Sequence, residues 1–216
     1  MSLNPFKTIG IGVTFSPNLK ANISEAARLA LFFDAKLVLI HVGEQSKDKE
    51  NTFKTFLKPF IGKQLICDVV FKAGNPVEVI LSAVNENKID LLILGALKRE
   101  TFFKYYIGSI ARKITREAKC SVLLLIKPSI KRVPCQHIVV NGLEDPKTQQ
   151  TISTAFYVAK KLNANKITIV EEISQQEVAV NVNDDRSLRR STLVKERLKL
   201  REDTRVKKII NDIPLG

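Results

Sequence analysis

The sequence predicts an α/β protein with a doubly wound, parallel five-stranded sheet, followed by a partial second copy of the same unit. Short apolar segments alternate with amphipathic helical patterns along the N-terminal part of the chain. These segments are apolar throughout, which is typical of parallel strands that helices cover on both faces. A shift of 129 positions also aligns the N-terminal segment with a later one without a gap.

The first copy reads as an alternating series of strands and helices. In each helical pattern the apolar residues fall on one face, as Ile23, Ala26 and Ala30 do in the first helix. The predicted strands are Thr8–Val13, Lys36–Val42, Cys67–Phe71, Asp90–Leu94 and Ser121–Ile126. Four helices are predicted between these strands. The first ends near Phe33 and the second near Ile61, and the third and fourth span Pro76–Asn85 and Ser109–Glu117.

The internal repeat preserves residues at equivalent places in strand and helix. Identical pairs are Ile9 and Ile138, Pro17 and Pro146, Ser24 and Ser153, Ala30 and Ala159, and Ile40 and Ile169. In both copies a small polar residue and a proline precede the helix, as Ser16-Pro17 and Asp145-Pro146. We expect the polar residue to cap the helix and the proline to occupy its first turn.

The second copy is shorter than the first. Its strand at Ile167–Val170 is followed by a polar stretch and a basic helical segment, Ser187–Ile210. The sequence thus predicts two domains, residues 1–130 and 131–216, joined around the linker Lys127–Pro134. A half domain leaves an open sheet edge and an exposed apolar face. We therefore expect it to pack on the first domain or on another subunit.

A glycine-containing segment connects the fourth predicted strand to the fourth predicted helix. Gly95 ends the strand, while Gly108 and Ser109 begin the helix. Glycine lets a ligand approach the backbone closely, and the first N–H groups of a helix attract anions. The N–H groups of Ser109 and Ile110 and the Ser109 hydroxyl therefore predict a phosphate or other anion site.

This segment resembles the signature of the universal stress protein family, which is Gly, two residues, Gly, nine residues, Gly, and Ser or Thr. Lys98 stands at the second glycine position, and Gly95, Gly108 and Ser109 match the others. The flanking elements are also similar, so that the resemblance runs from about Pro5 to Ile126. It implies a Rossmann-like, adenine-nucleotide-binding fold with ATP or another adenine nucleotide as the ligand.

Two departures from the family pattern concern the ligand. Thr14 stands at the end of the first strand, where ATP-binding members usually carry aspartate. Its hydroxyl lacks the charge of a carboxylate but can still donate or accept one hydrogen bond. Lys98 could either obstruct the phosphate path or pair with phosphates. Val42 corresponds to the position whose backbone meets adenine. The remaining alternative is an empty pocket, in which the glycines only shape a loop.

Composition and motifs indicate which kinds of partner and activity to expect. The net charge of +13 suits nucleotides, nucleic acid or other acidic partners, and equally a solvated surface. Three cysteines without metal spacing and no secretion signal or membrane span indicate a cytoplasmic protein with reduced thiols. The sequence has no nucleophile elbow or P-loop, and both histidines have the setting of structural residues, so we expect no catalysis.

Two alternatives to a stress-response binding module stay open. The first is an enzyme of the same adenine-nucleotide-binding fold. The second is a nucleic-acid-binding protein, because basic and aromatic residues interleave in one loop, although packing explains those aromatics better. The residues of that loop are Arg99, Phe102, Phe103, Lys104, Tyr105 and Tyr106. The family resemblance also implies a homodimer formed through the last strand, Ser121–Ile126.

Overall fold

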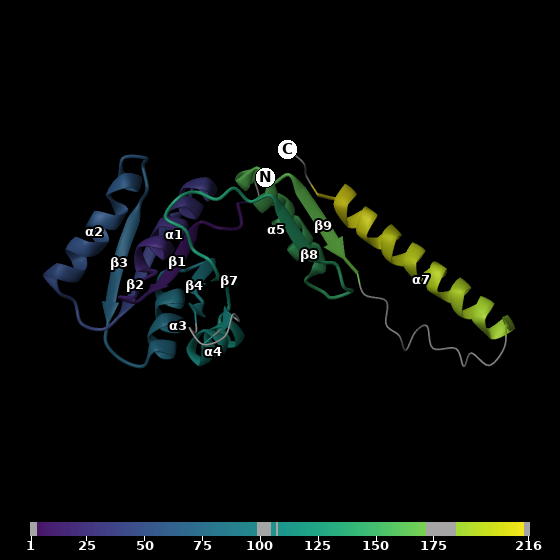
Figure 1. Ribbon diagram of the computed structural model, residues 1–216, viewed down its shortest axis with the longest axis horizontal. Coiled ribbons are helices and arrows are strands. Elements are labelled where there is room, and N and C mark those ends of the chain that lie inside the picture. Colours follow the sequence, from purple (N-terminus) through teal and green to yellow (C-terminus); the bar gives the residue numbers. More distant parts are fainter. Residues whose placement is uncertain (1–3, 99–104, 107, 172–184, 214–216) are drawn as a thin grey trace. The chain divides into compact units, whose positions relative to one another are not determined.

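The computed structural model describes residues 4–98, 105–106, 108–171 and 185–213. The chain divides into two compact units, Met1–Val133 and Pro134–Gly216 (Figure 1). The first unit contains the glycine segment.

The first unit is built on a five-stranded parallel sheet in the order β3-β2-β1-β4-β7, which confirms the predicted doubly wound sheet. The order reverses between β1 and β4, and ligands of such sheets bind at this switch point, outside the carboxyl ends of the strands. The strands are β1 (Thr8–Val13), β2 (Lys36–Val42), β3 (Cys67–Lys72), β4 (Leu91–Gly95) and β7 (Ser121–Leu125).

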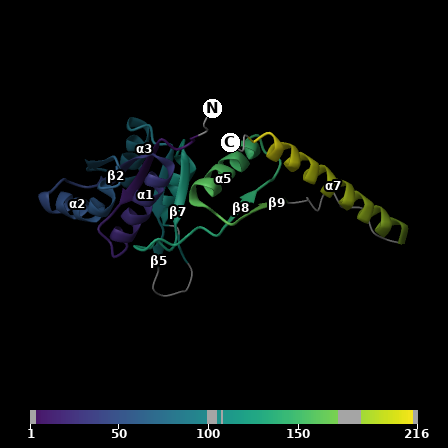
Figure 2. The same cartoon turned by 90° about the horizontal axis from the view of Figure 1, so that it is seen from above.

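Helices cover both faces of this sheet (Figure 2). Helices α1 and α2 pack together, and so do α3 and α4. Right-handed crossovers place the first pair on one face and the second pair on the other. Their bounds are Leu19–Phe33 for α1, Lys47–Ile61 for α2, Pro76–Glu86 for α3 and Ser109–Glu117 for α4.

Glycines in β1 allow α3 and its flanking residues to approach the sheet closely. A Cβ at Gly10 would lie 2.5 Å from Ile89, and one at Gly12 would lie 3.4 Å from Ile80 and Leu94. These three apolar residues belong to a buried cluster that joins β2, β4, α3 and α4. The close packing fixes β1 at the centre of the sheet, where its carboxyl end forms part of the switch point.

The segment after β7 folds back on α1 instead of leaving the first unit. Arg28 of α1 donates hydrogen bonds to the carbonyls of Ile130 at 2.7 Å and Ser129 at 2.5 Å. The guanidinium of Arg132 lies 4.8 Å from the ring centroid of Phe32. Most of the predicted linker is therefore part of the first unit.

The second unit contains a two-stranded parallel sheet of β8 (His137–Asn141) and β9 (Lys166–Val170). Its helices are α5 (Thr148–Leu162) and α7 (Asp185–Asn211). Helices α1 and α5 both have 15 residues and begin 129 positions apart, since 148 − 19 = 129, which supports the internal repeat.

The predicted capping residues lie in a turn before each helix and not at its N-cap, although the side chain of Asp145 accepts a hydrogen bond from Lys147 N at 2.8 Å. Asn18 and Lys147 occupy the N-cap positions, and neither side chain makes a capping hydrogen bond. A turn precedes each helix, in which the carbonyl of Ser16 or Asp145 accepts a backbone hydrogen bond of 3.0 Å. The proline of each pair lies in that turn and not in the first turn of the helix.

Candidate anion-binding site

The carboxyl edge of the sheet brings together three of the residues singled out in the sequence. Val13 pairs with His41, so the next residue, Thr14, falls beside Val42. Ile11 pairs with Ile93 of β4, and the same register places Val13 beside Gly95. Thr14 is exposed, whereas Val42 and Gly95 are half-buried. These strand ends form one side of the candidate site.

The start of α4 forms the other side. Gly108 is buried at the N-cap, and the first backbone hydrogen bond within the helix runs from Arg112 N to the carbonyl of Gly108, at 3.0 Å. The N–H groups of Ser109 and Ile110 precede this bond and have no helical acceptor. Both residues are exposed, so their N–H groups and the positive end of the helix dipole are available to an anion.

Gly108 does not need to be glycine for its backbone conformation. Its φ of −57° is open to every residue type. Glycine matters at this position because it has no side chain. A Cβ at this buried N-cap would cover the N–H groups of the first turn of α4.

Lys98 lies in the short strand β5 (Leu97–Lys98), which pairs antiparallel with β6 (Tyr105–Tyr106). Leu97 faces Tyr106 and Lys98 faces Tyr105, so the two ends of the glycine segment run side by side. Sequence reasoning missed this pairing, because two-residue strands carry no periodic signal. The loop residues Arg99, Phe102, Phe103 and Lys104 lie outside the described residues.

Sequence reasoning also missed Asn22 of α1. A Cβ at Gly95 would lie 2.8 Å from the amide nitrogen of Asn22, so a larger residue there would have to displace this side chain. The amide oxygen of Asn22 is buried and has no hydrogen-bond partner. A buried polar atom without a partner costs free energy, so it marks a point where a ligand or water has a donor to supply.

His41 contacts the end of β1 next to the candidate site. Its Nδ1 lies 3.2 Å from the carbonyl oxygen of Val13, the residue before Thr14. The ring is 7% exposed and makes edge contacts with Phe15 and Phe71, at centroid distances of 5.3 Å and 5.7 Å. These contacts agree with the structural role expected from the sequence.

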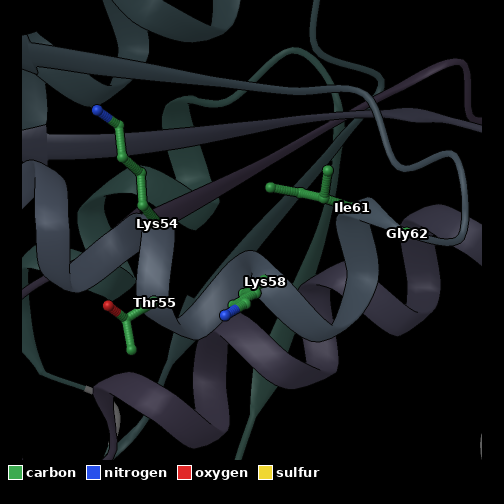
Figure 3. Close-up of a pocket in the computed structure, with 5 residues that line it drawn as sticks. All are labelled: Lys54, Thr55, Lys58, Ile61 and Gly62. Atoms are coloured by element: carbon green, nitrogen blue, oxygen red, sulfur yellow. The ribbon is translucent and has the colours of Figure 1, made fainter.

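In the described residues, a surface hollow, possible metal ligands, possible membrane spans and the cysteines were also considered as signs of function. A shallow hollow of about 360 Å³ is lined by the end of α2 and contains none of the predicted site residues (Figure 3). Among the described residues, no group of His, Cys, Asp and Glu could hold a metal ion, and no helix could span a membrane. The three cysteines are free.

Comparison with known proteins agrees with this architecture. The model of the universal stress protein family matches residues 44–125. A curated relative from Thermus aquaticus, "Universal stress protein in QAH/OAS sulfhydrylase 3'region", is 27% identical over 135 residues, which are 56% of this chain and 98% of the relative. Both matches fall in the first unit, which is therefore similar to proteins of the universal stress protein family.

A solved structure is similar in fold over most of this chain. A putative universal stress protein from Pseudomonas aeruginosa UCBPP-PA14 covers 94% of this chain and 72% of its own, with a TM-score of 0.64 and 13% identity. A universal stress protein in complex with cAMP covers 56% of this chain and 97% of its own, with a TM-score of 0.47 and 20% identity.

Proposed function

We propose that this protein is a stress-response binding module whose first unit holds an adenine nucleotide or another anion at the carboxyl edge of its sheet. The observation that carries the proposal is the start of α4, where Gly108 is buried and Ser109 and Ile110 are exposed. Their N–H groups precede the first helical hydrogen bond and suit a phosphate group.

Two residues weaken the site for ATP in this proposal. Thr14 offers a hydroxyl where ATP-binding members of the family usually carry a carboxylate, so the nucleotide loses a charged partner. Lys98 stands where glycine would leave room, and we favour obstruction of the phosphate path over a phosphate clamp. The proposal therefore includes weak binding of ATP by the natural chain.

The proposed module binds without catalysing a reaction and works in the cytoplasm. Ser109 is exposed at the start of α4, and the one described histidine near the sheet edge, His41, is buried against the carbonyl of Val13. Among the described side chains this leaves the Ser109 hydroxyl without an evident base, and a serine needs one to act as a nucleophile. We further propose that the second unit is a partial copy of the first, which the shared helix length and spacing support.

Equilibrium dialysis against ATP tests the proposed site. Gly108→Val should abolish binding, because its side chain would cover the N–H groups of the first turn of α4. Gly62→Val is the matched control, since no atom lies within 4 Å of a Cβ there, and it should bind like the natural chain. Equal binding by the Gly108 and Gly62 variants, or no binding by the natural chain at millimolar ATP, would refute the proposal.

A further inference from the structure

Positive charge in the first unit is concentrated in one stretch of the chain, residues 109–133. This stretch holds seven basic residues and one acidic residue, Glu117, whereas residues 4–98 hold twelve basic and nine acidic ones. The seven basic side chains are all exposed, and they belong to Arg112, Lys113, Arg116, Lys119, Lys127, Lys131 and Arg132. The stretch therefore attracts anions locally, whatever the net charge of the whole chain.

Four of these residues lie on α4 or just after it and are called the basic stripe: Arg112, Lys113, Arg116 and Lys119. Counted from Ser109, the three helical members recur at i+3, i+4 and i+7, so they share one face of α4. The opposite face is apolar, and Ile114 on it is fully buried in the cluster that joins α4 to the sheet. Helix α4 thus packs on the first unit with one side and presents the basic stripe to solvent.

The charges of the basic stripe repel one another. Like charges three or four residues apart on a helix are destabilising, and Arg116 lies at these spacings from Lys113 and Arg112. Glu117 relieves little of this repulsion, because its carboxylate lies 4.0 Å from Lys113 Nζ and the two side chains are 46% and 62% exposed. An anionic partner would remove the repulsion, so the arrangement favours one.

The form of the basic stripe distinguishes between anionic partners. A helix that lies on a membrane inserts its apolar face among the lipids, but the apolar face of α4 is buried in the first unit. A nucleic-acid strand presents one phosphate per nucleotide along a line. Arg112 and Arg116 lie about 6 Å apart along the helix axis, and each guanidinium can bind a phosphate through two hydrogen bonds. A flexible single strand can align successive phosphates with this row, whereas the carboxylates of a protein partner have no such fixed repeat.

We propose that the basic stripe binds the phosphate backbone of a single strand of nucleic acid. Arg112 and Arg116 pair with successive phosphates, and Lys113 and Lys119 add charge on either side of them. The contacts are to the backbone, so binding does not depend on the base sequence. The stripe uses side chains, whereas the proposed nucleotide site uses the N–H groups at the start of α4. The two proposals therefore fail or hold independently.

The test uses the full chain and a fluorescently labelled single-stranded oligonucleotide of mixed sequence, with fluorescence anisotropy measured at several salt concentrations. Binding should be saturable and should weaken steeply with salt. Arg112→Gln combined with Arg116→Gln should weaken it about tenfold or more at low salt. The double variant should also reduce the slope of log K against log salt by about 1.4, since each phosphate contact on a single strand contributes about 0.7.

Lys58→Gln combined with Lys63→Gln is the matched control, because it removes the same net charge at two exposed residues outside the stretch. This control should bind the oligonucleotide like the natural chain. Amide chemical shifts of the natural chain provide a readout that does not depend on a variant, and the oligonucleotide should perturb Arg112, Lys113, Arg116 and Lys119.

Four results would overturn this proposal. They are no saturable binding by the natural chain at low salt, equal binding by the two double variants, chemical-shift changes confined to other residues, and equal or tighter binding of a duplex of the same length. Tighter binding to vesicles of phosphatidylserine and phosphatidylcholine than to the oligonucleotide would assign the stripe to a membrane surface and contradict the proposal as well.

Discussion

At the scale of single residues, two separate reasons favour glycine at position 95. The sequence pattern attributes it to close approach of a ligand, and the structure adds a packing reason, because Asn22 occupies the space that a side chain would need. The residue could be predicted, but the contact could not, since no local pattern indicates that α1 crosses the end of β4. Thr14 and Val42 were placed at the same edge because parallel strands align their carboxyl ends.

Lys98→Gly distinguishes the two roles of this lysine. If Lys98 obstructs the phosphate path, as proposed, the substitution should strengthen ATP binding in a calorimetric titration. Weaker binding by the variant, or tight binding by the natural chain, would contradict obstruction and favour a phosphate clamp. Ser109→Ala should weaken binding by about 1 kcal/mol, which corresponds to one neutral hydrogen bond.

Cys67 should react slowly with alkylating agents in the folded protein. Burial raises the pKa of its thiol to about 12, with a smaller contribution from Asp68, so little thiolate is present near neutral pH. Because the thiolate is the nucleophile, alkylation by iodoacetamide at pH 8 should be about tenfold slower or more in the native chain than in urea. Peptide mass spectrometry measures the rate, and equal rates in both states would contradict the burial of this thiol.

At the scale of elements, periodicity was enough to predict most helices and strands. The predicted span Ser109–Glu117 is that of α4, and Thr8–Val13 and Lys36–Val42 are those of β1 and β2. The start of α1 was wrong because a proline after a polar residue also suits a turn, and the chain inserts such a turn before Leu19. Local sequence does not distinguish the two.

Arg28 should keep the segment after β7 on the first unit. It donates to the carbonyls of Ser129 and Ile130, and it pairs with Glu25 at 3.0 Å. Arg28→Ala should therefore speed tryptic cleavage after Lys131, measured by mass spectrometry. Lys113→Ala removes an exposed ion pair elsewhere and should leave the cleavage rate unchanged. Equal cleavage of both variants would show that the segment does not depend on Arg28.

Helix α7 should loosen in acid through Glu202. Hydrogen bonds from Arg205 lower the pKa of Glu202, and Arg205 also binds the carbonyl of Gly142. A lowered pKa stabilises the fold above the ordinary carboxyl pKa, and this stabilisation is lost as the pH falls through the lowered value. Glu171 acts in the opposite direction, because burial and the Glu202 charge raise its pKa.

Hydrogen exchange of α7, corrected for the intrinsic effect of pH, should therefore show a loss of protection in acid that Glu202→Gln reduces. Glu196→Gln changes an exposed carboxylate on the same helix and should keep the full pH dependence. A Glu202→Gln variant with the full pH dependence would contradict this account of the helix.

At the scale of the whole molecule, the structure does not identify the surface on which the second unit packs. Within its described residues the sheet of this unit has two strands, and Val139 and Val170 on them are 62% and 49% exposed. A two-stranded sheet is marginally stable by itself, and here α5 packs against it. Packing of this unit on the first one or on another subunit stays a prediction, because internal repeats predict which residues correspond and not where the copies meet.

The protein should be a homodimer that associates through β7, the second edge of the five-stranded sheet. Light scattering at micromolar concentration should give twice the chain mass, and Ile126→Lys should give a monomer, since this side chain is 51% exposed next to β7. Val133→Lys alters a side chain that is 71% exposed and should stay dimeric. A monomeric mass for the natural chain would refute the prediction.

The central claim is that the carboxyl edge of the first unit binds an adenine nucleotide or another anion. Amide chemical shifts recorded during titration with ATP test it most directly, because they detect weak binding and locate it. The account predicts saturable shifts at Thr14, Val42, Ser109 and Ile110, with little change in the second unit. Shifts confined to other residues, or none up to millimolar ATP, would contradict the claim.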